Sequence, residues 1–213
     1  MKHLYLNLKR FDVPRQYGGV NSLAPIERWA DYIVTGTQGE LKKFDPTQVE
    51  FVQFYPEAHI LNALKAREAQ SPVKIGCQGV YRMNTAAGGN FGAFTTSRPA
   101  SSMKAMGCTH AIIGHCEERK DKAGILWEAG VEDARAVNRL LNEENRRAAE
   151  AGMKVLYCVG EKEEELSRWK EVLTDQLEIG LEGVDKNQVV IGYEPIWSIG
   201  PGKIPADGPY IAK

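Results

Sequence analysis

The sequence lacks the features that would direct it to a membrane or to a polyanion. It has no apolar run of roughly 18 residues, the length at which a helical span becomes a candidate. The opening segment 1–10 is too polar for a signal peptide. Its 27 Lys and Arg residues balance 28 Asp and Glu residues, for a net charge of -1. We therefore expect neither nucleic acid nor a membrane as a partner, and an anionic ligand would need local groups to hold it.

Cysteine is also scarce. The four cysteines, Cys77, Cys108, Cys116 and Cys158, are scattered and form no CxxC pair. In a chain of 213 residues, this spacing is typical of reduced thiols rather than of a disulfide framework. We predict a cytoplasmic protein.

What the chain does have is a regular alternation of two patterns. Hydrophobic residues make up 43% of the composition, enough for a sizeable core. Short segments rich in Val, Ile, Leu and Tyr, several without clean alternation, are typical of strands covered on both faces. The predicted strands are His3–Lys9, Val49–Tyr55, Val73–Cys77, Thr109–Gly114, Lys154–Gly160 and Gln188–Tyr193.

Amphipathic helices are predicted between these strands. They cover Leu23–Thr35, Ala58–Ala69, Pro99–Met106, Glu132–Ala151 and Glu163–Leu181. Gly107 and Gly152 follow two of them, where a helix is expected to stop. The succession predicts an α/β fold with one parallel sheet and right-handed crossovers. It fits an open six-stranded sheet or the first six units of a (β/α)8 barrel, and does not choose between them.

Polar residues follow most of the predicted strands. They are Asn7, Lys9, Gln78, His115, Glu161 and Glu194. Because ligands of parallel sheets gather at the carboxyl ends of the strands, we expect a site there. Glu194 is either a salt-bridged strand-end carboxylate or a partly desolvated general base. Lys9 either extends to solvent or waits for an anion.

His115 has two interpretations as well, a hydrogen-bonded structural residue or a catalyst. If a helix begins directly after it, the helix N-terminus favours a neutral ring. Metal binding by His115, Cys116 and Glu117 is the weaker interpretation, because adjacent residues on an extended strand cannot all face one ion. We interpret the run 161–165 as a solvated helix start.

The segment 193–208, YEPIWSIGPGKIPADG, has stiff ends around a small-residue middle, which favours a closing lid. The Gly200 amide could meet a phosphate oxygen. The GPGK piece lacks the glycine spacing and the Ser or Thr of a Walker loop. Two other segments, 10–21 and 81–97, are long and predict functional or interfacial loops.

Together these segments resemble the triosephosphate isomerase family. The resemblance is carried by NLK (7–9), GAFT (92–95), AIIGHCEER (111–119), CVGE (158–161) and YEPIWSIGPGK (193–203). It implies a TIM barrel, a place in glycolysis and gluconeogenesis, and isomerisation of dihydroxyacetone phosphate and glyceraldehyde 3-phosphate through an enediolate. No cofactor and no metal are implied.

The resemblance also implies the residue roles. Glu194 would be the base and neutral His115 the electrophile, as is usual in this family. Asn7 and Lys9 would hold the enediolate and its phosphate, and Gly200 would contact the phosphate from the lid. A homodimer would form through the Tyr81–Ser97 loop, with Thr95 at the tip that enters the neighbouring site. Cys116, Glu117 and Arg119 would support the site.

Several positions depart from the family. Cys116 stands where Ser is usual, Leu8 where Trp is usual and Gly79 where Asn is usual, while both long loops are enlarged. These changes suggest an alternative substrate, a four-carbon keto-sugar phosphate such as an erythrulose phosphate. An alternative of another class is a non-catalytic sugar-phosphate-binding protein. The family's seventh and eighth strands bind phosphate through Gly-rich turns, and they are not represented here, so we expect 1–213 to be a single TIM-barrel domain incomplete at its C-terminus.

Overall fold

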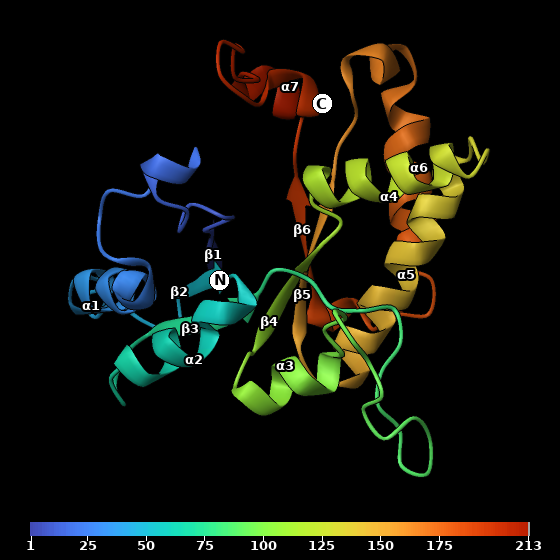
Figure 1. Ribbon diagram of the computed structural model, residues 1–213. Coiled ribbons are helices and arrows are strands. Elements are labelled where there is room, and N and C mark those ends of the chain that lie inside the picture. The colour runs from blue at the N-terminus through green and yellow to red at the C-terminus, as the bar shows by residue number, and fades with distance from the viewer. Residues whose placement is uncertain (213) are drawn as a thin grey trace.

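The computed structural model describes residues 1–212, which form one parallel sheet with the strand order β1-β2-β3-β4-β5-β6 (Figure 1). The strands are β1 (Lys2–Asn7), β2 (Val49–Tyr55), β3 (Val73–Cys77), β4 (His110–Ile113), β5 (Lys154–Val159) and β6 (Val189–Tyr193). All six lie within one or two residues of the predicted strands. The prediction of a parallel sheet is confirmed.

Helices connect the strands. The α-helices are α1 (Trp29–Leu41), α2 (Glu57–Ala66), α3 (Ala100–Met106), α4 (Cys116–Glu128), α5 (Ala134–Glu150), α6 (Trp169–Gly180) and α7 (Gly208–Ile211). Short 3-10 helices are η1 (Arg15–Tyr17), η2 (Ile26–Arg28), η3 (Glu163–Arg168), η4 (Lys186–Gln188) and η5 (Ile196–Ser198). Among residues 1–212, no helix combines the length and the apolar character needed to cross a membrane.

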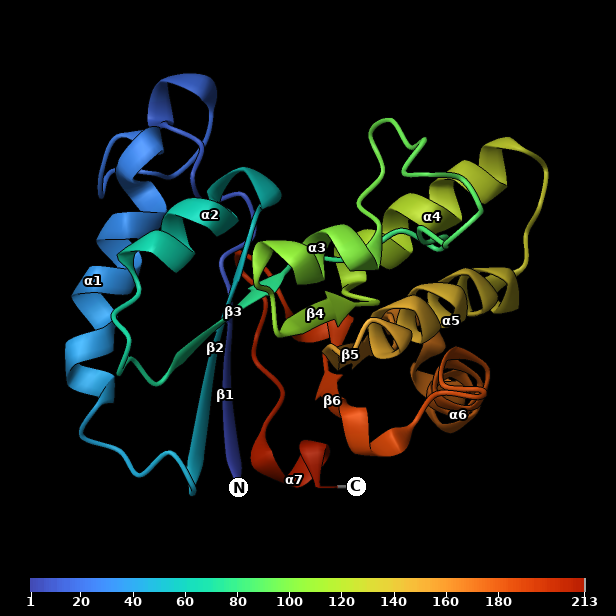
Figure 2. The same cartoon turned by 90° about the horizontal axis from the view of Figure 1, so that it is seen from below.

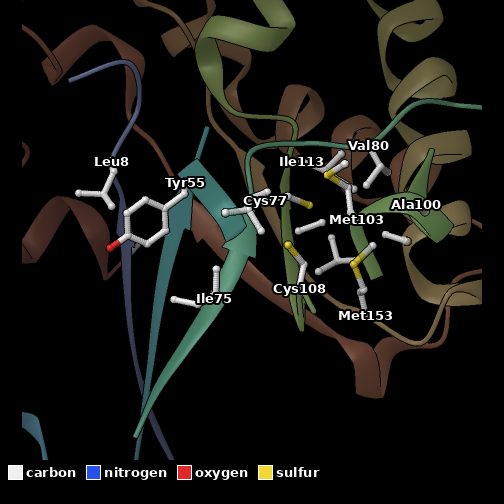
Figure 3. Packing of buried hydrophobic residues seen from close by; sticks show 14 of the residues in the cluster. Leu8, Tyr55, Ile75, Cys77, Val80, Ala100, Met103, Cys108, Ile113 and Met153 are labelled. Atoms are coloured by element: carbon white, nitrogen blue, oxygen red, sulfur yellow. The ribbon is translucent and has the colours of Figure 1, made fainter. Parts of the chain in front are cut away.

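The sheet is curled, with α1 and α2 outside β1–β3 and with α5 and α6 outside β4–β6 (Figure 2). The main apolar core lies between the sheet and these helices and includes Tyr55, Ile75, Met103 and Met153 (Figure 3). A smaller cluster of Val52, Phe54, Ile112 and Cys158 packs on the opposite face. Phe54 and Tyr55 belong to different clusters because successive strand residues point to opposite faces. The smaller cluster therefore lies on the inner, concave face of the curled sheet, and the main core lies on its outer face, under the helices.

The two edge strands leave apolar side chains exposed. Leu4 and Leu6 on β1 are 56% and 48% exposed, and Ile191 on β6 is 44% exposed. Both strands lie at an edge of the sheet within the described part of the chain.

Several helices differ from the predictions. Helix α2 ends at Ala66 rather than at Ala69, and α6 begins at Trp169 rather than at Glu163, because 163–168 form the 3-10 helix η3. Helix α1 was predicted over Leu23–Thr35, but Pro25 disfavours helical backbone at the residue before it, so α1 begins at Trp29 after η2. It continues past Thr35 because the buried Gln38 donates a hydrogen bond to Ala66 O at 3.2 Å. Helix α4 was not predicted as an element, since no residue in it is buried and its sequence shows no apolar stripe.

Candidate active site

The carboxyl end of β4 turns sharply into α4 and thereby presents His115. Gly114 makes the turn with φ 79°, and an added Cβ would lie 2.8 Å from Cys158 O, so only glycine fits there. His115 is the N-cap of α4, and its Nδ1 accepts a hydrogen bond from the backbone N–H of Glu117 at 3.3 Å. A helix therefore does begin directly after His115, which is the condition under which the helix N-terminus favours a neutral ring.

Glu194 follows β6 and faces His115. Its backbone N–H donates to Val159 O at 2.8 Å, and an added Cβ on Gly160 would lie 1.8 Å from Glu194 O. The glycine of the CVGE segment thus permits the close approach of the two strand ends. Glu194 Oε1 lies 2.8 Å from His115 Nε2, and Glu194 Oε2 accepts a hydrogen bond from the backbone N–H of Cys116 at 3.0 Å.

This contact governs the protonation of the ring. Burial lowers the pKa of His115, but hydrogen bonds with Cys116 and Glu194 and the charge of Glu194 raise it, to about 10 in all. The backbone N–H of Glu117 directed at Nδ1 works in the other direction, because it favours a nitrogen without a proton. The ligand-free pair therefore favours a protonated ring, and the neutral ring stays a prediction for the substrate complex.

Asn7 ends β1, and Lys9 lies in the turn that follows. Lys9 has φ 45°, and its backbone N–H donates to Asn7 Oδ1 at 3.0 Å. The amide of Gln78, at the end of β3, donates to Lys9 O at 3.0 Å and to Asn7 Oδ1 at 3.3 Å. Gln78 thus fixes the left-handed turn that presents Lys9, a role that its strand-end position alone did not indicate.

The ammonium of Lys9 reaches across to α4. Its Nζ lies 2.9 Å from Glu117 Oε1, an ion pair whose carboxylate side chain is 64% exposed. A polar cavity of about 560 Å³ opens here, and Asn7, Lys9 and His115 line it. A second cavity of about 610 Å³ lies between α4, α5 and α6 with a mainly apolar lining. Because Asn7, Lys9, Gln78 and His115 line the first cavity, and Glu194 contacts His115, that cavity is the candidate active site.

Arg119 anchors the start of α4 against β5. Its Nε donates to Gly114 O at 2.8 Å, and its Nη2 donates to both Tyr157 OH and Cys158 O, each at 2.9 Å. Beside it, Glu118 accepts a hydrogen bond from Gly114 N–H at 2.6 Å. These bonds hold the turn that carries His115.

The interpretation of 161–165 as a solvated helix start is wrong for Glu161. The solvated helix start holds for Glu163 and the following residues of η3, but Glu161 is 0% exposed. It accepts hydrogen bonds from Tyr193 OH and Trp197 Nε1, both at 2.8 Å, and from Tyr210 OH at 3.1 Å. The carboxylate thus links the start of the segment 193–208 to Tyr210 in α7, just after the end of the segment. The aromatic donors that bury it are distant in sequence, which is why a run of acidic residues looked solvated.

Gly200 and Thr95 are not brought to the cavity. Gly200 has φ 122° with nothing within 4 Å of an added Cβ, and Thr95 is exposed in the 81–97 loop. Neither residue lines the polar cavity. Within the described residues, the structure brings together Asn7, Lys9, His115, Glu117 and Glu194, with Cys116 beside the last.

A family model for triosephosphate isomerase matches residues 30–208. The chain belongs to the triosephosphate isomerase family. It is 34% identical over 166 residues to the triosephosphate isomerase of Geobacter metallireducens, covering 76% of this chain and 59% of that protein. It is 33% identical over 150 residues to that of Synechococcus sp. RCC307, covering 70% of this chain and 52% of that protein.

The fold agrees with this family. The crystal structure of triosephosphate isomerase from Bartonella henselae matches with a TM-score of 0.65 at 23% identity, covering 92% of this chain and 68% of the other. The six curled strands are thus the corresponding part of a (β/α)8 barrel, as the family resemblance implied. The chain spans about half the length of the curated relatives that it matches.

Proposed function

We propose that this chain carries the catalytic groups of an aldose–ketose isomerase acting on dihydroxyacetone phosphate and glyceraldehyde 3-phosphate. The observation that supports this most is the direct contact of Glu194 with His115 beside the cavity that holds Asn7 and Lys9. A carboxylate, an imidazole and an ammonium at one opening supply a base, an electrophile and a cation.

In the proposed reaction, Glu194 removes the proton from the carbon next to the carbonyl. His115 polarises the carbonyl oxygen, and the electron pair of the broken C–H bond moves onto that oxygen to give an enediolate. Lys9 and Asn7 stabilise its negative charge. His115 then moves the hydroxyl proton of the enediolate from one oxygen to the other, and Glu194 returns the carbon-bound proton to the neighbouring carbon. The proton moves without a net oxidation, so the reaction balances without a cofactor.

Substrate must separate Glu194 from His115, because 2.8 Å leaves no space for a carbon–oxygen unit between them. Separation removes the hydrogen bond and the charge of Glu194 that raise the pKa of His115. It leaves the burial that lowers this pKa and the hydrogen bond with Cys116 that raises it. Substrate binding would therefore free the base and shift the ring toward its neutral form in one movement.

The segment 193–208 would close over the bound substrate. Its ends are held by the buried Glu161, whereas its middle, around Gly200, is exposed. Fixed ends with an exposed middle allow the Gly200 amide to move toward the phosphate while the flanks stay in place. Closure would exclude water and protect the enediolate.

A coupled assay with dihydroxyacetone phosphate tests the proposal. We expect turnover by the purified protein well above that of Glu194→Gln. Equal rates for the two proteins would contradict it. Binding of an enediolate mimic such as phosphoglycolate with no turnover would instead support a non-catalytic sugar-phosphate-binding protein.

One observation favours a four-carbon keto-sugar phosphate as a second candidate substrate. Arg10 and Phe11, from the enlarged loop after β1, line the polar cavity. They add to the lining an aromatic ring and a guanidinium, which pairs with Asp12 at 2.8 Å, as further contacts for a longer substrate. Comparing kcat/KM for three- and four-carbon phosphates decides, and equal or higher values for the trioses would exclude this candidate.

We also propose a homodimer through the 81–97 loop, which projects from the body of the protein (Figure 1). The loop is closed at its base by a 2.8 Å hydrogen bond from Tyr81 N–H to Arg98 O, and Phe91 within it is 88% exposed. An exposed aromatic ring on a braced loop suits an interface. Sedimentation analysis of Phe91→Ser tests this, and an unchanged dimer would argue against the loop as the contact.

A further inference from the structure

Three side chains with metal-binding atoms meet at the start of α4. His115 is the N-cap of this helix and Cys116 is its first residue, while Glu194 approaches from the end of β6. The argument against a metal at this sequence held for an extended strand, where neighbours point to opposite sides. Here the chain turns at Gly114, so His115 and Cys116 face the same space, and Glu194 rather than Glu117 completes the group.

The distances suit a tetrahedral ion. Cys116 Sγ lies 3.6 Å from His115 Nδ1, and one ligand atom from each of the three residues lies within 4.8 Å of the other two. Zinc bonds of about 2.3 Å to sulfur and about 2.0 Å to nitrogen place two such ligands roughly 3.5 Å apart. The thiol and Nδ1 of the imidazole already have this separation. Glu194 Oε1 contacts the other ring nitrogen, Nε2, at 2.8 Å, so the carboxylate must move toward Nδ1 to complete the set. The ion would also replace the hydrogen bond that Nδ1 accepts from Glu117 N–H.

The donor set selects the class of ion. A thiolate, an imidazole and a carboxylate suit zinc and similar thiophilic cations, whereas Mg²⁺ prefers an all-oxygen shell. Three protein ligands leave a fourth tetrahedral position open. Among residues 1–212, this is the one group of three such side chains close enough to share an ion. Cys116 is half-buried and opens toward solvent, while Cys77, Cys108 and Cys158 are buried.

We propose that the ligand-free site binds one thiophilic divalent cation, of which Zn²⁺ is the type, through His115, Cys116 and Glu194. The Cys116 thiol loses its proton to solvent and bonds as a thiolate, and a protonated His115 ring loses one as well. Because the family usually has Ser at this position, and a hydroxyl is a poor zinc ligand, the site belongs to this chain's own sequence. The bound ion occupies Glu194 and His115 and so excludes the sugar phosphate, a consequence that rests on the proposed function.

Direct binding tests the site without any assay of turnover. We expect one Zn²⁺ per chain by calorimetry on the purified protein, with proton release, and no heat with Mg²⁺. Co²⁺ in place of Zn²⁺ should give a near-ultraviolet thiolate-to-metal absorption band. Cys116→Ser should remove this band and weaken Zn²⁺ binding at least tenfold. His3→Asn is the matched control, because His3 contacts Glu50 at 2.9 Å in a pair that has no cysteine, and it should bind Zn²⁺ like the parent.

The outcomes separate this site from the isomerase proposal. Unchanged Zn²⁺ affinity in Cys116→Ser, or a Co²⁺ spectrum of the parent protein without the thiolate band, would overturn the metal site. Because the Co²⁺ spectrum is taken on the parent, this test does not depend on the folding of a variant. Metal binding without any isomerase activity in the metal-free protein would uphold the site and contradict the proposed function. If both hold, Zn²⁺ should compete with the sugar phosphate, and a chelator should restore the rate.

Discussion

Glu194 Oε1 and His115 Nε2 lie 2.8 Å apart, so the proposed base and the proposed electrophile are each other's partner in the ligand-free protein. Their side chains are only 17% and 13% exposed, and little water screens the pair. The contact satisfies two partly buried polar groups that would otherwise be unpaired when no substrate is bound. In the proposed mechanism, this carboxylate must therefore move away from His115, in addition to the closure of the segment 193–208.

The first prediction concerns that carboxylate. Glu194→Gln keeps the shape of the side chain and removes its basicity, so we expect kcat to fall by about 10²- to 10⁴-fold, the range for a general base. The coupled assay measures it. Glu178→Gln, which changes an exposed carboxylate on α6, serves as the control and should keep the parent rate. A Glu194→Gln variant with near-parental kcat would assign the base elsewhere.

The second prediction concerns the protonation of His115. Its pKa is raised to about 10, with the Glu194 contact among the causes, so the ligand-free ring should be protonated at pH 8. A raised pKa stabilises the fold fully below the ordinary value of about 6.5, and this contribution is lost as the pH rises toward 10. Nitrogen chemical shifts of the ring measure the charge directly. Glu194→Gln should lower the pKa, and a bound enediolate mimic should give a neutral ring; a neutral ring at pH 8 in the free protein would contradict the prediction.

The sequence predicted the sheet more completely than the site. The strands are short apolar runs bounded by turn residues, so local pattern and tertiary burial point to the same answer. Helix α4 was not predicted because none of its residues is buried and its sequence has no apolar residues at helical spacing. Predicting the site required knowing which strand ends lie next to one another in the folded sheet. The positions of Asn7, Lys9, His115 and Glu194 followed from the order of elements, but the direct His115–Glu194 contact depends on the close approach at Gly160, which no local pattern encodes.

The third prediction concerns Glu161, which holds the flanks of the segment 193–208. Glu161→Gln retains one acceptor oxygen but places an amide group among Tyr193, Trp197 and Tyr210, all of which donate to the carboxylate. We expect the free energy of unfolding to fall by about 1–3 kcal/mol, the cost of disrupting a buried charged acceptor. Urea titration measures it. Glu164→Gln, at an exposed position nearby, should change stability little, and equal losses in the two variants would argue against the role of Glu161.

The fourth prediction concerns Glu50, a 3% exposed carboxylate near the amino-terminal end of the sheet. It contacts Tyr5 OH at 2.7 Å, His3 Nδ1 at 2.9 Å and Lys74 Nζ at 2.6 Å. Burial alone would raise the pKa of Glu50, but the hydrogen bonds from Lys74, Tyr5 and His3 outweigh it and hold the pKa well below its ordinary value. A lowered pKa stabilises the fold above the unfolded value of about 4.3, and this contribution is lost as the pH falls further.

Glu50→Gln should therefore destabilise the protein at pH 7 and flatten the decline of its stability below pH 4. At pH 7 we expect a loss of about 1–3 kcal/mol in the free energy of unfolding, because three donors lose a charged acceptor while the buried side chain remains. Urea titrations at pH 3 to 7 measure both effects, with Glu178→Gln as the exposed control. If the parent and Glu50→Gln lost stability in parallel over this range, the acid sensitivity would originate in other carboxylates, and the contacts of Glu50 would contribute packing rather than charge.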